Sequence, residues 1–211
     1  MDENNISSEK VDGRKTRRSR NKKKALDAFI KLVDEQAKLP SAEDIACEAG
    51  VSRRSIFRYF NDIDQLVVAA YNYQIEKLKD KFPPPSPAEP EDDREEKIDE
   101  YVEHLSSIYE FTASMREVFS EKGLPADIRK KLNKMRSDTL RKRLEEFFDI
   151  FLENNDDLKL ESDRSQKNFF FGLESFLSPE SWDYLRGPCG LSCERAKKVW
   201  KGLLLRIFKK C

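Results

Sequence analysis

The stretch SAEDIACEAGVSRRSIFRYF, residues 41–60, decides the fold of this chain. Its spacing predicts a helix-turn-helix, in which two short helices cross at a sharp turn. Ala46 lies at the expected crossing, where only a small side chain fits, and Gly50 supplies the left-handed turn that a larger residue would resist. The apolar interface shared by the two helices is expected to contain Ile45, Val51 and Ile56.

Polar residues mark the starts of both helices. Ser41 followed by Asp44 has the spacing of a capping box, in which the hydroxyl accepts from an unpaired backbone N–H and the helix dipole favours the acid. Ser52 can cap the second helix in the same way, so this helix is predicted over residues 53–60.

The second helix carries polar residues on or near its outward face. They are Arg53, Arg54, Ser55, Arg58 and Tyr59. Arginine can pair with guanine O6 and N7 or clamp a phosphate, and serine and tyrosine hydroxyls can reach phosphate oxygens. This pattern indicates a helix that reads DNA, whereas the plainer interpretation is a solvated surface helix.

Charge is distributed unevenly along the chain. The formal net charge is zero, which would argue against a nucleic-acid partner if the charges were spread evenly. Between Arg14 and Lys24, however, there are eight Lys or Arg residues and no acid, while the segment after Phe82 is acidic. The basic segment favours a polyanionic partner, with Lys22 and Lys23 as candidate phosphate contacts.

The rest of the chain is patterned as helix. It is 38% charged with only 7 Gly, and apolar residues recur at helical spacing rather than in strict alternation. A first helix is predicted over residues 17–38 and ends before Pro40, and a fourth begins near Asn61. The prolines from Pro83 to Pro90 exclude a continuous helix there. The expected fold class is therefore all-α.

The register of the motif resembles the TetR (tetracycline-repressor-like) family of transcriptional regulators. The matching residues are Asp44 to Ala46, Ala49 to Ser52, Ser55 to Phe60, and Gln65 with Leu66. The likeness covers residues 25–78, about a quarter of the chain. Two positions depart from the family pattern: Phe57 stands where a tyrosine is common, and Ile63 where many members carry a lysine.

The resemblance implies a domain organisation. It comprises a disordered tail over residues 1–16, a three-helix helix-turn-helix domain over 17–62, a connecting helix over 63–82, a proline-rich linker over 83–94, and a helical ligand-binding and dimerisation domain over 95–211.

The resemblance also implies a function. We expect a sequence-specific transcriptional regulator, a repressor, which binds a palindromic double-stranded operator as a homodimer and is released by a small-molecule effector of unknown identity. The expected DNA contacts are Ser41, Ser52, Arg53, Arg54, Ser55, Arg58, Tyr59, Lys22 and Lys23. Arg53 and Arg54 are the candidates for base contacts, and Ser41, Ser55 and Tyr59 for phosphates.

Aromatic and apolar residues of the second block provide candidates for the regulatory sites. Tyr101, Tyr109, Phe147 and Phe170 could line an effector cavity, although each could equally be core. Phe169, Leu173, Trp200 and Leu203 are candidate dimer contacts, with Trp200 and Leu203 as anchors, unless they pack within the monomer.

Other sites are poorly supported by the sequence. Cys189 and Cys193 lie four residues apart without nearby His or further Cys, so no metal is expected, and the four cysteines fit reduced thiols. His104 is the single histidine, and no glycine-rich phosphate loop occurs, so neither an enzyme nor a cofactor is expected. No apolar run is long enough for a membrane span, and we expect a cytoplasmic protein.

Two alternative functions remain open. A DNA-bound adaptor or structural protein could use the same head but answer to a protein partner; a filled core in the second block would favour it. A helical enzyme or lipid carrier could use the helix-turn-helix only as scaffold; loss of DNA binding at physiological salt would favour that.

Overall fold

The computed structural model of the chain is built from helices. It describes residues 13–89, 92–120, 124–153 and 163–208, and within these ranges there are ten helices and no strand. This confirms the all-α fold predicted from the sequence. The helices are α1 (Gly13–Gln36), α2 (Ala42–Ala49), α3 (Arg53–Phe60), α4 (Ile63–Lys81), α5 (Arg94–Phe111), α6 (Ala113–Ser120), α7 (Ala126–Glu153), α8 (Asp163–Phe176), α9 (Pro179–Arg186) and α10 (Cys193–Ile207).

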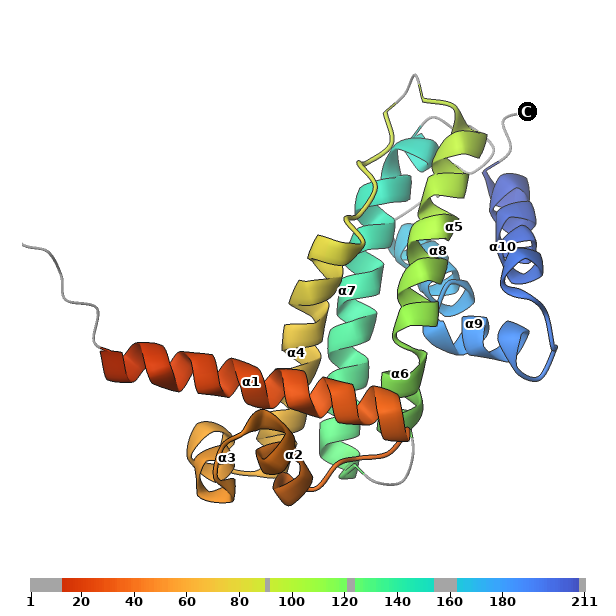
Figure 1. The fold of residues 1–211 in the computed structure, drawn as a ribbon. Coiled ribbons are helices and arrows are strands. Elements are labelled where there is room, and N and C mark those ends of the chain that lie inside the picture. Colours follow the sequence, from red (N-terminus) through yellow and green to blue (C-terminus); the bar gives the residue numbers. More distant parts are fainter. Residues whose placement is uncertain (1–12, 90–91, 121–123, 154–162, 209–211) are drawn as a thin grey trace, which may run out of the picture.

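Helices α1 to α4 form a head at one end of the molecule (Figure 1). One stripe of α1, with Ala25, Phe29 and Val33 fully buried, packs on α2 and α4. Ile45 and Ile56, expected at the interface of the motif, are also buried in this cluster. The apolar spacing read from the sequence therefore defines the core of the head.

The first helix differs from its predicted bounds at both ends. It begins at Gly13, so residues 13–16, expected in the disordered tail, are helical; the rest of that tail lies outside the described residues. It ends at Gln36 because Ala37 adopts a left-handed conformation with φ of 49°. The N-terminal turns of α1 project beyond α2 and α3 (Figure 1).

The core of the head extends into the helices that follow it. Met115 and Val118 of α6 and Leu132 of α7 are buried in the same cluster as Phe29. In Figure 1, α6 lies against the C-terminal half of α1. The head and the lower part of the body are thus packed on one apolar seam, in addition to their covalent connection through α4.

A second core occupies the upper body and is rich in aromatic rings. The rings of Trp182 and Trp200 lie 4.7 Å apart, and those of Phe148 and Phe208 stack at 4.8 Å. The Tyr109 hydroxyl donates to the Leu177 carbonyl at 2.9 Å, which ties α5 to the end of α8. These contacts hold α5, α8, α9 and α10 together. No helix in the described part of the chain is both long enough and apolar enough to span a membrane.

The proline-rich segment between α4 and α5 packs on the body. Ala88 is buried in the upper core, and Lys97 Nζ lies 3.2 Å from Ser86 Oγ. Beneath this segment, a cavity of about 140 Å³ is lined by prolines, Tyr101, His104 and Arg143. The linker therefore covers the flank of α5 and α7.

His104 lies under this linker in an environment that favours its neutral form. Burial and the neighbouring Arg143 charge lower its pKa from 6.5 to about 4, although a hydrogen bond to the Pro83 backbone opposes the shift. Because proline has no N–H, the imidazole must be the donor in that bond. The Nε2 atom is buried without a partner among the described residues.

We predict that the single imidazole titrates well below pH 6.5 in the folded protein, which a proton NMR titration can measure directly. A lowered folded-state pKa means that the unfolded chain binds the proton more readily, so His104 costs no stability above pH 6.5 and destabilises as pH falls from 6.5 toward 4. The variant His104→Phe should lose less stability than the parent over that interval. An imidazole titrating at the ordinary pKa would contradict this.

Candidate nucleic-acid interface

Local capping and one glycine build the turn between α2 and α3. Ser41 Oγ accepts from the Asp44 backbone N–H at 3.2 Å, and the Asp44 carboxylate accepts from the Ser41 backbone N–H at 3.2 Å, which forms the predicted capping box. Gly50 has φ of 64°, and the Val51 N–H bonds to the Ala46 carbonyl at 3.0 Å. A side chain at position 50 would be strained in this left-handed conformation. The orientation of α3 against α2 therefore depends on Gly50.

The start of α3 carries two exposed arginines. Ser52 caps the helix by accepting from the Ser55 N–H at 3.2 Å. Arg53 and Arg54 occupy the first two helical positions, and both are exposed. The Arg53 guanidinium lies 5.7 Å from the centre of the Phe57 ring, which is itself 36% exposed. The N-terminal end of α3 thus presents two positive charges and an aromatic face to solvent.

The second half of α3 is less exposed than predicted. Tyr59 was expected on the outward face, but it is only 9% exposed because its ring packs into the head. Its hydroxyl bonds to Asn21 and Arg58, each at 3.5 Å, and Arg58 also donates to Ser55 Oγ at 3.3 Å. Burial alone would raise the pKa of the Tyr59 phenol, but these hydrogen bonds outweigh it and lower the pKa. Tyr59 therefore orients Arg58 and joins α1 to α3.

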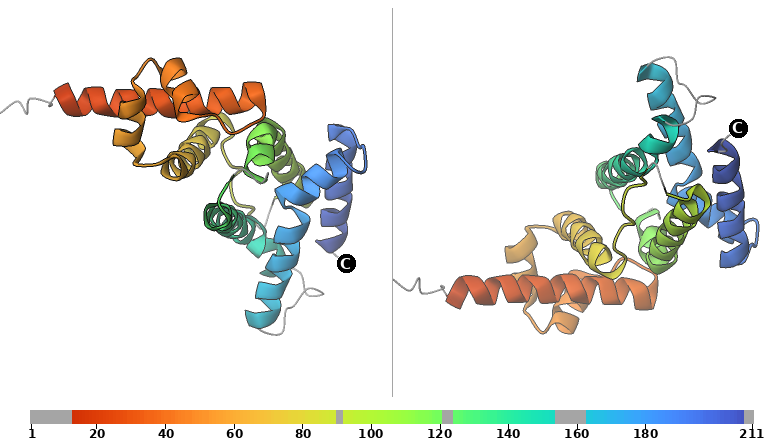
Figure 2. Two further views of the ribbon diagram at one scale, coloured as in Figure 1. Left: turned by 90° about the horizontal axis from the view of Figure 1, so that it is seen from below. Right: turned by 90° about the horizontal axis from the view of Figure 1, so that it is seen from above.

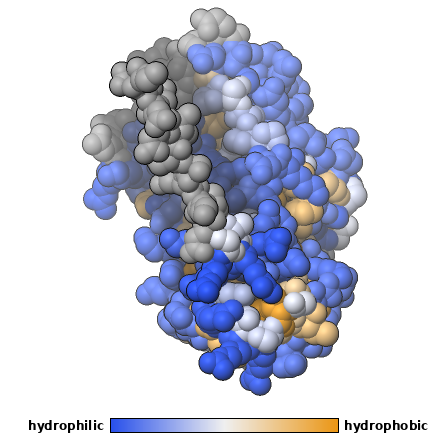
Figure 3. Space-filling view, turned by 60° about the vertical axis from the view of Figure 1, so that its left-hand side comes forward, coloured by the Kyte–Doolittle hydropathy of each residue, from blue (hydrophilic) through white to orange (hydrophobic). Residues whose placement is uncertain are grey.

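An open, acid-free cleft of about 510 Å³ lies between α1 and α3. One side is lined from α1 by Arg14, Arg17, Arg18 and Asn21, and the other side by Gly50, Val51, Ser52, Ser55, Arg58 and Tyr59. The Arg18 guanidinium also donates to the Arg58 carbonyl at 3.5 Å. Figure 3 views the end of the molecule at which α1 begins, where strongly hydrophilic side chains gather. The cleft joins the basic segment to the second helix of the motif.

The two lysines singled out from the sequence do not line this cleft. Lys22 lies over the Phe60 ring, with Nζ 5.3 Å from the ring centre. Lys23 follows Arg14 by two and a half helical turns and so lies on the opposite side of α1. Sequence reasoning missed Arg17 and Arg18 as candidate contacts. The signal was available, because positions 14, 17, 18 and 21 share one helical face.

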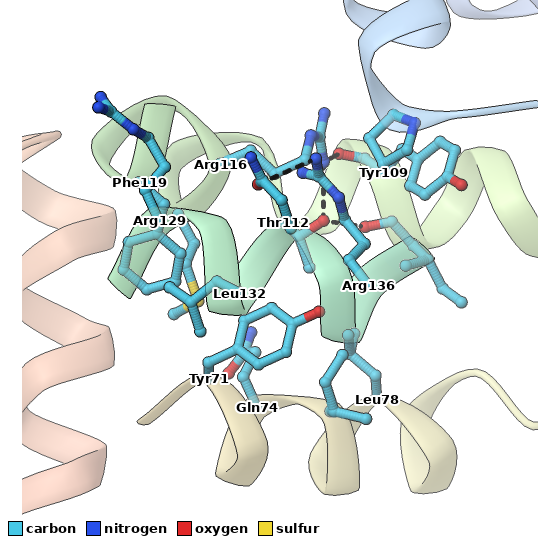
Figure 4. A pocket seen from close by; sticks show the side chains of 15 residues that line it. Tyr71, Gln74, Leu78, Tyr109, Thr112, Arg116, Phe119, Arg129, Leu132 and Arg136 are labelled. Carbon is cyan, nitrogen blue, oxygen red and sulfur yellow. Dashed lines mark hydrogen bonds between the residues drawn. The ribbon is translucent and has the colours of Figure 1, made fainter. Parts of the chain in front are cut away.

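A largely apolar cavity of about 100 Å³ lies below the upper core (Figure 4). Its walls come from α4, α5, α6 and α7, with Pro179 of α9 at one side. Of the four predicted cavity residues, Tyr109 borders it. Tyr101 and Phe147 lie under the proline-rich linker instead, and Phe170 is 2% exposed within the upper core. Phe170 is therefore a core residue and does not line a cavity, which was the simpler of the two interpretations.

Two of the four predicted dimer contacts are buried inside the chain. Trp200 is fully buried and Leu173 is 3% exposed, so neither can anchor a second subunit directly. Phe169 is half-buried, with its ring 6.0 Å from that of Phe208, whereas Leu203 is 39% exposed. The expectation that Trp200 contacts a second subunit was wrong, because its side of α10 packs against α5 and α9.

Other residues of α8 and α10 remain exposed. Together we call them the α8–α10 face; they are Phe171, which lies over the Arg141 guanidinium, and Gly172 on α8, and Val199, Gly202 and Leu203 on α10. Phe171 is 50% exposed and Val199 37%. At both glycines an added Cβ would meet nothing within 4 Å. No contact among the residues that the structure describes therefore accounts for glycine in the middle of these two helices.

The cysteines stand apart from these sites. Cys47, Cys189 and Cys193 are free thiols, and Cys211 lies outside the described residues. Cys193 is the first residue of α10, and partial burial raises its pKa. In the parts of the chain that the structure describes, no group of three or more His, Cys, Asp or Glu side chains could hold a metal ion.

Comparison with known proteins bears on the head alone. Residues 41–70 match the family model described as bacterial regulatory proteins, tetR family. No curated protein matches the chain. The matched residues comprise α2, the Gly50 turn, α3 and the first part of α4, which are the elements that build the exposed arginine pair and one wall of the cleft. Residues 41–70 therefore carry the DNA-binding helix-turn-helix characteristic of TetR-family transcription regulators, formed by α2 and α3.

Proposed function

We propose that the protein is a repressor that binds a palindromic operator as a homodimer and responds to a small-molecule effector. The observation that carries the proposal is the acid-free cleft between α1 and α3, which lies beside the exposed arginines at the start of α3. In a chain of zero net charge, this concentration of arginine supports a polyanionic partner at one place on the surface.

The proposed docking places the N-terminal end of α3 in the major groove. Arg53 and Arg54 then face the base edges, where a guanidinium can pair with guanine. Arg58 and the α1 arginines lie along the cleft and contact the phosphates of one strand. Phosphate contacts fix the position of the protein, and base contacts give specificity. Ser41 and Ser52 assist mainly as helix caps, since their hydroxyls already bond to the backbone.

Homodimerisation is proposed to occur through the α8–α10 face. Both views of Figure 2 place α8 and α10 away from α1, so a second subunit there leaves the DNA-binding surface free. Gly172 and Gly202 would let helices of two subunits approach closely, and Phe171 and Leu203 would be covered. Glycine in a helix interior is less favourable than alanine by about 1 kcal/mol, which a close helix contact would offset.

Effector control is proposed to act through the cavity of Figure 4. Its lining includes α4, which continues from the head, and α6, which packs against α1. A ligand there can change DNA affinity only if it favours one position of the head over another, which is typically worth about 5- to 150-fold.

The size of the cavity favours one alternative. At about 100 Å³ it is well below the roughly 300 to 1,000 Å³ of ordinary ligand pockets. A DNA-bound adaptor that answers to a protein partner therefore remains the second candidate. Selection of bound DNA from a random pool tests what both share: we expect a palindrome with half-sites about 34 to 36 Å apart. A selected sequence without two-fold symmetry would contradict the dimeric mode.

We predict that Arg53→Ala and Arg54→Ala each weaken binding to the selected operator by about 1 to 3 kcal/mol and relax preference at one base pair. Binding to random DNA should change much less. Fluorescence anisotropy with both DNAs measures the difference. If each variant binds operator as the parent does, α3 is not the reading helix.

We predict that the double variant Arg17→Gln and Arg18→Gln weakens operator and random DNA alike. Each lost phosphate contact should flatten the slope of log affinity against log salt by about 0.9. The double variant Arg20→Gln and Lys23→Gln is the matched control, since it also removes two positive charges from α1, at positions that do not line the cleft, and it should leave the slope nearly unchanged. Equal effects of the two changes would show that only net charge matters.

We predict that Leu203→Glu converts the dimer to a monomer in sedimentation at micromolar concentration, because a charge would be placed in an apolar interface. The matched control Tyr184→Glu introduces the same side chain and the same charge at an exposed position of α9 outside this face, and it should stay dimeric. A dimer that persists in Leu203→Glu would exclude this face.

A further inference from the structure

The lining of the cavity is asymmetric in charge. Most of it is apolar, but Arg116, Arg129 and Arg136 border it and no Asp or Glu does. Figure 4 shows the Arg116 and Arg136 side chains close together on the side away from α4, with the Tyr71 ring rising from α4 toward them. The cavity thus has an apolar body and a cationic end.

Arg116 is tied to α9 and to the end of α5. Its Nε lies 3.1 Å from the Asp183 carboxylate, and Nη2 also bonds to that carboxylate. Its Nη1 donates to the Tyr109 carbonyl and, at 2.7 Å, to Thr112 Oγ1. The Arg116 side chain is only 11% exposed, whereas that of Asp183 is 50% exposed.

Arg136 repeats this arrangement from α7. Its guanidinium pairs with Glu180, also on α9, and lies 3.4 Å from Asn133 Oδ1. The Arg136 side chain is 28% exposed against 63% for Glu180. The third arginine, Arg129, has no side-chain hydrogen bond or ion pair to any residue that the structure describes.

The difference in exposure decides which partner can leave. A carboxylate that is half or more exposed regains its hydration when it is released, and such surface ion pairs contribute little. A largely buried guanidinium, by contrast, is costly to leave without an anion. An anion that enters the cavity can therefore displace the α9 carboxylates, and the arginines remain paired throughout.

We propose that the cavity binds a small carboxylate with a short apolar body, which replaces Asp183 and Glu180 as the partner of Arg116 and Arg136. This inference rests on the effector site of the proposed function and assigns its ligand class. An engineered apolar cavity of about 150 Å³ admits benzene, so this one, at about 100 Å³, accepts an apolar body smaller than a benzene ring. The carboxylate would lie at the arginine end.

The exchange would act on the head through α6. Arg116 belongs to α6, which packs on α1, and its pairing with Asp183 ties that helix to α9. When a ligand carboxylate replaces Asp183 as the partner of Arg116, α6 is no longer tied to α9. The apolar seam between α6 and the head is kept. A change at the cavity thereby reaches the helix that carries the DNA-binding cleft.

Calorimetric titration with four probes tests the ligand class. Butanoate should bind, and butanamide should bind about tenfold or more weaker, because a charge-assisted hydrogen bond is lost. Benzoate and benzamide, whose ring is too large for the cavity, should bind much more weakly than butanoate. Arg129→Met and Arg116→Met should weaken butanoate binding and not butanamide binding. Equal binding of butanoate and butanamide, or no binding of any probe, would overturn the proposal.

Asp183→Asn tests the displacement. Removal of the competing carboxylate should tighten butanoate binding by about two- to fivefold. The control Glu103→Gln breaks a surface pair with Lys197 far from the cavity and should change nothing. Weaker acid binding in Asp183→Asn would overturn the displacement.

Operator binding separates this inference from the proposed function. Acids that bind as described and shift operator affinity support both. Acids that bind without any shift support the ligand class and contradict effector control. Intact operator binding in a protein that binds no acid leaves the repressor assignment and overturns the ligand class.

Discussion

The apolar seam between α1, α6 and the start of α7 is the constraint on which the rest of the structure depends. Phe29 is fully buried there, together with Met115, Val118 and Leu132 from parts of the chain far away in sequence. A connection through α4 alone would leave the head free to turn about one helix. With the seam, α1 also packs against α6, and Leu132 of α7 is buried in the same cluster, so the position of the head depends on that of α6.

The seam also explains why the cavity lies where it does. A cavity of about 100 Å³ remains between the lower core and the aromatic upper core, and its walls include α4, α6 and α7. Polar groups, chiefly the arginines, border the gap that remains. The ion pairs to α9 complete the structure around it, because they join the upper and lower cores across the gap. The packing of the apolar seam therefore positions both the head and the candidate regulatory site.

Features of the head that depend on neighbouring residues could be predicted from the sequence. The capping box at Ser41, the left-handed Gly50 and the cap at Ser52 all follow from local hydrogen bonding and backbone sterics. Tyr59 could not be placed, because its direction is decided by Asn21, 38 residues away.

The body was predicted less well for the same reason. The spacing of α10 indicated an apolar face but not which neighbour would cover it, so Trp200 was assigned to a subunit contact although it packs against Trp182. Likewise, the cavity residues were predicted from aromatic content. The cavity instead lies where α4, α6 and α7 border one another, which the sequence pattern does not reveal. Of the four predicted cavity residues, only Tyr109 borders the cavity, and its hydroxyl also joins α5 to the end of α8.

The projecting end of α1 has a thermodynamic consequence. Its first turn contains no acid, so positive side chains lie at the positive end of the helix dipole. Like charges also face one another four residues apart, as in Arg14 with Arg18 and Arg18 with Lys22. Both effects oppose helix formation in these turns, and bound anions would relieve both. Helix formation and anion binding at this end are therefore linked equilibria: each favours the other by the same free energy.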